Sequence, residues 1–155
     1  MATKENAAVL MVDNNGKILS GRTGEKTSLK DALNKLGAKK LIAIGGNKSI
    51  ADKTLKGLEN VDVQRIGGRD RFETALNIAK ATYPESDNVM VANGNHAVDA
   101  LSAGAVTAQA KSPIILVEKD NIPENISSEL KGKKITVLGG VKTLSDKLVE
   151  KLNNL

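Results

Sequence analysis

The sequence predicts an α/β domain with a mainly parallel central sheet flanked by helices. Short apolar runs alternate with amphipathic segments along the chain, and this alternation is typical of strand–helix units that feed a parallel sheet. A helix–strand unit that ends in a glycine pair occurs twice, which indicates an internal repeat. At 155 residues the chain has the size of one ordinary domain.

The first expected element is a β-hairpin near the N-terminal end. Asp13-Asn14-Asn15-Gly16 is a turn signal that would fold residues 9–12 against residues 17–19. Such a hairpin would add antiparallel pairing at one edge of the sheet. The apolar runs predict strands at residues 7–12, 40–44, 61–65, 88–92, 113–117 and 134–138.

Between these strands, apolar residues recur at helical spacing, and each such segment is expected to lie on a face of the sheet. Thr27 or Ser28 can cap the first helix, and Asp70 with Glu73 has the spacing of a capping box. Pro123 suits a first helical turn, where its missing N–H is not needed. The helical segments are residues 29–36, 50–58, 72–78, 101–106, 126–130 and 144–152.

The internal repeat relates residues 36–53 to residues 130–147. Gly45 corresponds to Gly139, an offset of 94 positions. Each glycine pair ends an apolar strand and opens a helix, but neither pair has the full spacing of a dinucleotide-binding or phosphate-binding loop. A tight turn is therefore the favoured interpretation of both pairs.

The repeat also predicts the domain organisation. We expect residues 1–155 to form a single domain, in which residues 1–60 resemble half of a repeat and residues 61–155 form one full repeat. The start of the chain lacks the apolar stretch of a secretory signal, and no run approaches the length of a membrane span. The sequence alone leaves the localisation open.

The composition excludes several classes of function. Phe72 and Tyr83 are the only aromatic residues, so we expect no nucleic-acid partner that stacks bases on exposed rings. With no cysteine and only His96, a zinc cluster and a thiolate nucleophile are excluded. We expect no metal, no cofactor and no membrane partner, whereas the net charge of +5 allows an anionic partner.

The densest polar motif runs over residues 65–75, where a strand should pass into a helix. Two glycines, a helix N-terminus and three arginines can form an anion cradle. The alternative is that the arginines pair with carboxylates and hold the loop to a neighbouring helix or subunit. The candidates for polymer or anion binding are Arg65, Arg69 and Arg71, and those for a structural loop or subunit contact are Gly67, Gly68, Asp70, Glu73 and Asp99.

A second polar loop, at residues 93–102, contains a histidine, an aspartate and a serine. No nucleophile elbow is present, and Asp99 and Ser102 would share a helix face instead of flanking His96. We therefore predict no catalytic residues. Asp99 is expected near a helix start, where its carboxylate can accept backbone N–H groups or meet an arginine.

The order of four motifs, at residues 65–75, 89–104, 112–117 and 135–140, resembles the type 2 cell wall-binding repeat of clostridial surface-layer and cell wall proteins. The resemblance implies an α/β module that assembles in threes and anchors proteins to an anionic wall polysaccharide. In that family a Pro-Ile-Leu-Leu-like segment is implicated in the contact, and the matching residues here are Pro113, Ile114, Ile115 and Leu116. The chain departs from the family at Ala97-Val98, where Phe-Pro is usual.

Three functions follow as hypotheses. The first is a non-catalytic, homotrimeric binder of an anionic cell wall polysaccharide, which implies the bacterial cell surface. The alternative is a bacteriophage virion protein, a capsid decoration or tail component that has borrowed the fold and would contact capsid or tail proteins, in keeping with the lack of an export signal. A third, an enzyme with a phosphate-binding loop, rests on fold analogy only.

Overall fold

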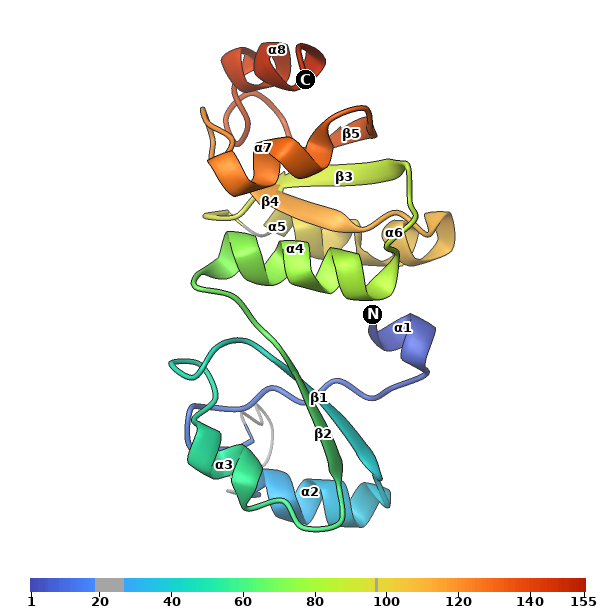
Figure 1. Cartoon of the computed structure of the whole chain (residues 1–155), viewed down its shortest axis with the longest axis vertical. Helices are drawn as coiled ribbons and strands as arrows, with labels where there is room; N and C mark the ends of the chain where they lie inside the picture. Colours follow the sequence, from blue (N-terminus) through green and yellow to red (C-terminus); the bar gives the residue numbers. More distant parts are fainter. Residues whose placement is uncertain (19–26, 97) are drawn as a thin grey trace.

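A computed structural model of the chain describes residues 1–18, 27–96 and 98–155, and it confirms the α/β fold class (Figure 1). The elements, in chain order, are α1 (Ala2–Glu5), α2 (Leu29–Leu36), β1 (Lys40–Ile44), α3 (Asp52–Lys56), β2 (Asp62–Ile66), α4 (Arg71–Thr82), β3 (Asn88–Asn93), α5 (Val98–Ser102), α6 (Gly104–Ala110), β4 (Ile114–Val117), α7 (Glu124–Leu130), β5 (Lys134–Leu138) and α8 (Asp146–Asn153).

The strands form two parallel sheets in the described part of the chain, instead of the one central sheet expected. β1 pairs with β2, and the second sheet has the order β4-β3-β5. The sheets separate because β2 stays beside β1 while α4, which follows it, packs on β4. The chain thus crosses from one unit to the other between β2 and α4 (Figure 1).

The predicted strand at residues 7–12 is wrong. Its turn is present, since the Asp13 N–H donates to the Lys17 carbonyl over 2.9 Å and Gly16 adopts a φ of +77°. Pairing, however, is limited to single antiparallel bridges, one of which joins Val12 to Ile18. Val9 is 70% exposed, so no packed face holds this segment as a strand, and Leu19 lies outside the described residues.

The predicted helix caps at the start of α2 and α4 are confirmed. The Ser28 side chain accepts a hydrogen bond from the Asp31 N–H, and the Asp70 side chain accepts one from the Glu73 N–H. Each bond satisfies a backbone donor that the first helical turn leaves without a partner. Asp70 therefore fixes where α4 begins, directly after the crossing from β2.

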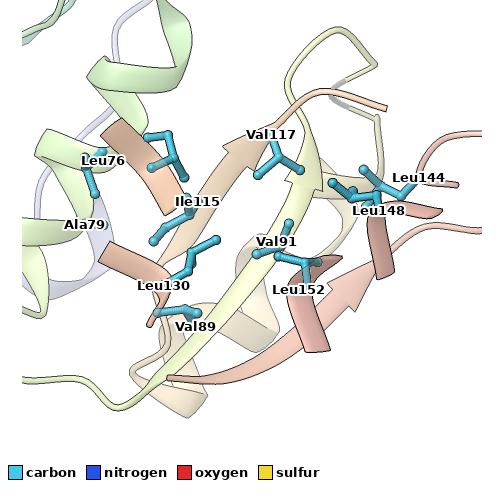
Figure 2. Close-up of a cluster of buried hydrophobic side chains, with 11 residues drawn as sticks. Leu76, Ala79, Val89, Val91, Ile115, Val117, Leu130, Leu144, Leu148 and Leu152 are labelled. Carbon is cyan, nitrogen blue, oxygen red and sulfur yellow. The ribbon is translucent and has the colours of Figure 1, made fainter. Parts of the chain in front are cut away.

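The main core lies on one face of the three-stranded sheet. Alternate residues of β3 and β4 point into it, and α4, α7 and α8 cover them. Figure 2 shows this cluster, whose buried members are Leu76, Ala79, Val89, Val91, Ile115, Val117, Ile126, Leu130, Leu144, Leu148 and Leu152. α5 contacts β3, and in Figure 1 α5 and α6 lie on the opposite side of this sheet from α7.

The internal repeat is also a structural repeat. Gly45 and Gly139 have φ angles of +119° and +118°, which residues other than glycine rarely adopt. The Ala51 N–H donates to the Asn14 carbonyl as the Ser145 N–H donates to the Lys119 carbonyl, each over 3.0 Å. The second bond shows that residues near Asn14 occupy the place that the loop after β4 has in the other copy.

The two copies differ in burial. Leu130 at the end of α7 is fully buried, whereas its counterpart Leu36 at the end of α2 is 57% exposed. The reason is that α4 packs on α7, while the first copy lacks β3 and α4 counterparts in the described residues. The N-terminal unit is therefore the less complete of the two.

Candidate binding site at the carboxyl ends of the strands

Polar loops from three parts of the chain meet at the carboxyl ends of β3 and β5. Arg71 Nη1 donates to the Gly94 carbonyl over 3.0 Å, which joins the start of α4 to the end of β3. The buried Asn93 amide donates to the Thr143 carbonyl, which joins β3 to the turn after β5. Ligands of open parallel sheets bind at this edge, so we name Arg71, Asn93, Asn95, Asp99 and Thr143 the carboxyl-end cluster.

Two glycines allow these loops to come close. A Cβ on Gly94 would lie 2.6 Å from Phe72 Cε1, and one on Gly139 would lie 2.6 Å from Asp99 Oδ2. Real Cβ atoms essentially never make contacts this short. Asp99, at the first turn of α5, is thus packed against the glycine turn after β5. Among the described residues, no arginine donates a hydrogen bond to its carboxylate.

The start of α4 carries an exposed ion pair. Arg69 Nε lies 2.8 Å from Glu73 Oε2, and the Arg69 N–H donates to the same oxygen over 2.9 Å. The side-chain hydrogen bond from Arg69, followed by the backbone bond, lowers the pKa of Glu73, and the same hydrogen bond raises the pKa of Arg69. The Arg69 side chain is 80% exposed, so its remaining N–H groups face solvent.

Arg65 lies in the other sheet and binds atoms of the chain itself. Its Nη1 donates to the Gly45 carbonyl over 2.7 Å, and its Nη2 donates to the Ile50 carbonyl over 2.8 Å and to Asp52 Oδ1 over 3.1 Å. A guanidinium with three such acceptors has little left for an external anion. The structure therefore separates Arg65 from Arg69 and Arg71.

Gly67 and Gly68 line the crossing between the two units. A Cβ on Gly67 would lie 2.8 Å from the Gly45 carbonyl oxygen, and one on Gly68 would lie 2.7 Å from Glu73 Cβ. The Asn77 amide donates to the Gly67 carbonyl over 2.8 Å. These close approaches hold the crossing against both the first glycine turn and α4.

The Pro113–Leu116 segment runs from the amino end of β4 to the carboxyl-end cluster, where a Cβ on Gly94 would lie 3.3 Å from Leu116 Cβ. Pro113 is buried just before β4, at the amino end of the sheet, where it lines a shallow pocket with Leu76 and Lys133. Ile115 points into the core, whereas Ile114 and Leu116 are half-buried on the other face. β4 thus separates Pro113, at the amino end of the sheet, from the carboxyl-end cluster, whereas Leu116 lies beside Gly94 at that end.

An exposed apolar surface on α5 and α6 was missed by the sequence analysis, which placed this segment on the sheet. Val98, Leu101 and Val106 are exposed, and Leu101 reaches 78%. Helical spacing alone predicted a buried stripe and could not show that α5 ends at Ser102 and that a second short helix follows. The Ala97-Val98 departure from the family pattern, directly before α5, was the available signal.

Other kinds of site find no support. In residues 1–18, 27–96 and 98–155, no group of three or more histidine, cysteine, aspartate or glutamate side chains could hold a metal ion. No helix in the described ranges is long and apolar enough to cross a membrane. The Ser102 hydroxyl donates to the Val98 carbonyl in its own helix over 3.0 Å, so this bond, and not one to His96, orients it.

Comparison with known proteins identifies a family. The model of the cell wall binding domain 2 (CWB2) family matches residues 65–149. The chain is 28% identical over 101 residues to the N-acetylmuramoyl-L-alanine amidase LytC of Bacillus subtilis and 31% identical over 96 residues to the amidase enhancer of the same organism. These matches cover 63% and 61% of the chain but only 20% and 14% of the relatives.

Solved structures agree with the family match. Cwp6 from Clostridium difficile superposes with a TM-score of 0.81 at 30% identity, over 99% of this chain and 24% of that one. Cwp8 from the same organism gives a TM-score of 0.76 at 29% identity, over 99% of this chain and 26% of that one. The fold of the whole described chain therefore occurs as about a quarter of each larger protein.

Proposed function

Because the chain belongs to the cell wall binding domain 2 family, we propose that it is a non-catalytic, homotrimeric module that binds an anionic polysaccharide of the bacterial cell wall. The family match carries the proposal, since residues 65–149 include every loop of the carboxyl-end cluster. Clostridial-type walls are the proposed target because Cwp6 and Cwp8 come from such an organism. The named relatives include no virion protein, so the virion alternative has no comparable support.

The anionic ligand is supported by charge and by geometry. The chain carries a net charge of +5, and Arg69 and Arg71 are exposed at the start of α4, where a helix N-terminus also favours anions. Arg71 uses one nitrogen on protein acceptors, so its remaining N–H groups are available to a carboxylate or phosphate of a polymer. We assign Arg71 and Arg69 as ligands and leave Arg65 a structural role.

Pro113, Ile114, Ile115 and Leu116 enter the proposal only through the family. Pro113 and Ile115 are buried, so any contact with a polymer would fall to the half-buried pair Ile114 and Leu116. A polymer that contacts Ile114, Leu116 and Arg71 would run along β4 toward its carboxyl end, where Leu116 and Arg71 both lie close to Gly94. Polysaccharide chains are long enough for this, which keeps the two regions compatible.

The trimer is supported by the apolar surface on α5 and α6. Exposed apolar side chains favour association, and Val98, Leu101 and Val106 are exposed on the neighbouring helices α5 and α6. Three copies related by a threefold axis would each bury this surface against a neighbour, in the closed symmetry usual for homo-oligomers. The binding sites of three modules on one particle would also raise the avidity for a repeating polymer.

The proposal is tested by light scattering and wall pelleting on one sample. Purified protein should elute with the mass of three chains and should sediment with clostridial walls, but not with walls stripped chemically of their anionic polysaccharide. Sedimentation should weaken as salt is raised, because ions screen exposed charges. A trimer that ignores intact walls at low salt would refute the polysaccharide, and a monomer that sediments would refute the trimer alone.

A further inference from the structure

The outer edge of β5 is the counterpart of an edge that is occupied in the first copy. β5 pairs with β3 on one side, and no strand in the described part of the chain pairs with its other side. Its counterpart β1 pairs there with β2, in parallel and over five residue pairs from Lys40–Asp62 to Ile44–Ile66. The first copy therefore shows what the edge of the second copy can bind.

β2 is held on β1 by side-chain hydrogen bonds as well as by the backbone pairing of the two strands. Arg65 reaches from β2 across the glycine turn and donates to the carbonyls of Gly45 and Ile50 and to the Asp52 carboxylate. The Gly45 N–H donates in turn to the Ile66 carbonyl over 2.8 Å. Two carbonyls and one carboxylate thus form a receptor for one arginine, which we name the arginine receptor.

The second copy has the same receptor. With the offset of 94 positions, its parts are the carbonyls of Gly139 and Leu144 and the carboxylate of Asp146. Among the described residues, none donates a hydrogen bond or an ion pair to these three acceptors, and the Gly139 N–H finds no protein acceptor. The backbone of the turn is alike in the two copies, with a φ of +118° against +119° and with the Leu144 N–H donating to the Gly140 carbonyl as the Ile50 N–H donates to that of Gly46.

The charges on the edge fit the same kind of strand. Lys40 of β1 stands opposite Asp62 of β2 in the register, and the counterpart of Lys40 on β5 is Lys134. Lysines also protect solvent-exposed sheet edges against unwanted pairing. Protection alone, however, does not account for an arginine receptor at the end of the strand.

We propose that the outer edge of β5 binds a parallel strand of the β2 type, supplied by another copy of this repeat. The incoming strand continues the sheet as β4-β3-β5-strand, and its arginine binds Gly139, Leu144 and Asp146 as Arg65 binds their counterparts. Backbone hydrogen bonds give such an added strand its affinity, and the arginine gives it its register. This contact involves neither Arg71 nor the surface of α5 and α6.

The test uses a synthetic peptide with the sequence of residues 60–70 and the full chain labelled with ¹⁵N. Saturable shifts of the backbone amides of β5 and Gly139, together with slower hydrogen exchange at the Gly139 amide, are the expected result. Shifts confined to β1 and Gly45 would mean that the peptide only displaces β2, and this outcome would overturn the proposal. Absence of saturable shifts would overturn it as well.

Matched variants isolate the receptor. A peptide with Arg65→Ala should bind at least about tenfold more weakly, because charge-assisted hydrogen bonds are lost. In the protein, Asp146→Asn should lower the affinity for the peptide by several fold. Asp52→Asn, the same change at the occupied receptor, should leave the affinity for the peptide unchanged. Equal affinity of the Arg65→Ala peptide would refute the assignment even if Asp146→Asn proved unstable.

Discussion

Asp99 Oδ2 lies 2.6 Å from the position that a Cβ atom on Gly139 would occupy. The contact joins the first turn of α5 to the turn after β5, and it leaves no room for a side chain. Gly139 also has a φ of +118°, so sterics and backbone conformation demand glycine for separate reasons.

Gly139→Ala should therefore destabilise the fold. We expect a loss of roughly 2–4 kcal/mol in the free energy of unfolding, from backbone strain and from overpacking against Asp99 and Thr143. Urea denaturation followed by circular dichroism measures it. Gly140→Ala is the matched control, because a Cβ there meets nothing within 4 Å. Equal losses for the two variants would contradict the contact.

Arg65→Ala should loosen the pairing of β1 with β2. The loss of three hydrogen bonds, one of them to a carboxylate, should cost about 3 kcal/mol, and Arg65→Lys should recover only part of it because a lysine cannot span the three acceptors in the same geometry. Thermal unfolding measures both variants. Arg69→Ala, which removes an exposed arginine from the neighbouring loop, should leave the melting temperature nearly unchanged.

Glu73 should make stability depend on pH. Its pKa is lowered by the hydrogen bonds from Arg69, so its contribution is present above the ordinary value of 4.5 and is lost as the pH falls through the lowered folded-state pKa. Titration of the Glu73 carboxyl by NMR should show the low pKa, and Arg69→Ala should raise it toward 4.5. An unchanged titration in that variant would show that the ion pair is absent in solution.

Leu101→Glu should dissociate the proposed trimer. A charge placed on the apolar surface of α5 and α6 cannot be buried between subunits without a partner, whereas the monomer fold should survive because Leu101 is exposed. Light scattering should then report one chain in place of three. Val9→Glu, the same kind of change at another exposed apolar position, should leave the trimer intact.

Arg71→Ala should weaken sedimentation with walls by roughly tenfold, the loss expected for a charge-assisted contact to the polymer. Lys56→Ala is the control, since it removes the same charge outside residues 65–149. Because Arg71 also donates to the Gly94 carbonyl, the melting temperature of the variant must be compared with that of the wild type. If a folded Arg71→Ala variant sedimented with walls as the wild type does, Arg71 would not be a ligand of the polymer.

Local sequence signals predicted the elements well where packing agreed with them. The strands later numbered β1 to β5 lie within one residue of their apolar runs, and Asp70 caps α4 as its spacing with Glu73 indicated. Residues 7–12 have an equally apolar pattern, yet they form only a bridge, because strand formation depends on a neighbour that the pattern of a single segment does not contain.

The candidate site was harder to predict. Arg65, Arg69 and Arg71 lie within seven positions of the sequence, but Arg65 turns back to the Gly45 carbonyl while Arg71 turns forward to the Gly94 carbonyl. The spacing shows that the arginines are close along the chain, but it does not show that they form hydrogen bonds with loops of different sheets. That division became visible only when β2 was found beside β1.

The parallel pairing of β1 and β2 has a mechanical consequence when the chain is placed under tension. Tension applied through the chain would pull β1 from the end where it begins and β2 from the end where it continues into α4. Since the strands are parallel, these forces oppose each other along the strand axis and load the ladder of five residue pairs together. The two strands would resist this force in shear. The hydrogen bonds from Arg65 to the Gly45 and Ile50 carbonyls would strengthen the pairing at the end of β2 that is pulled.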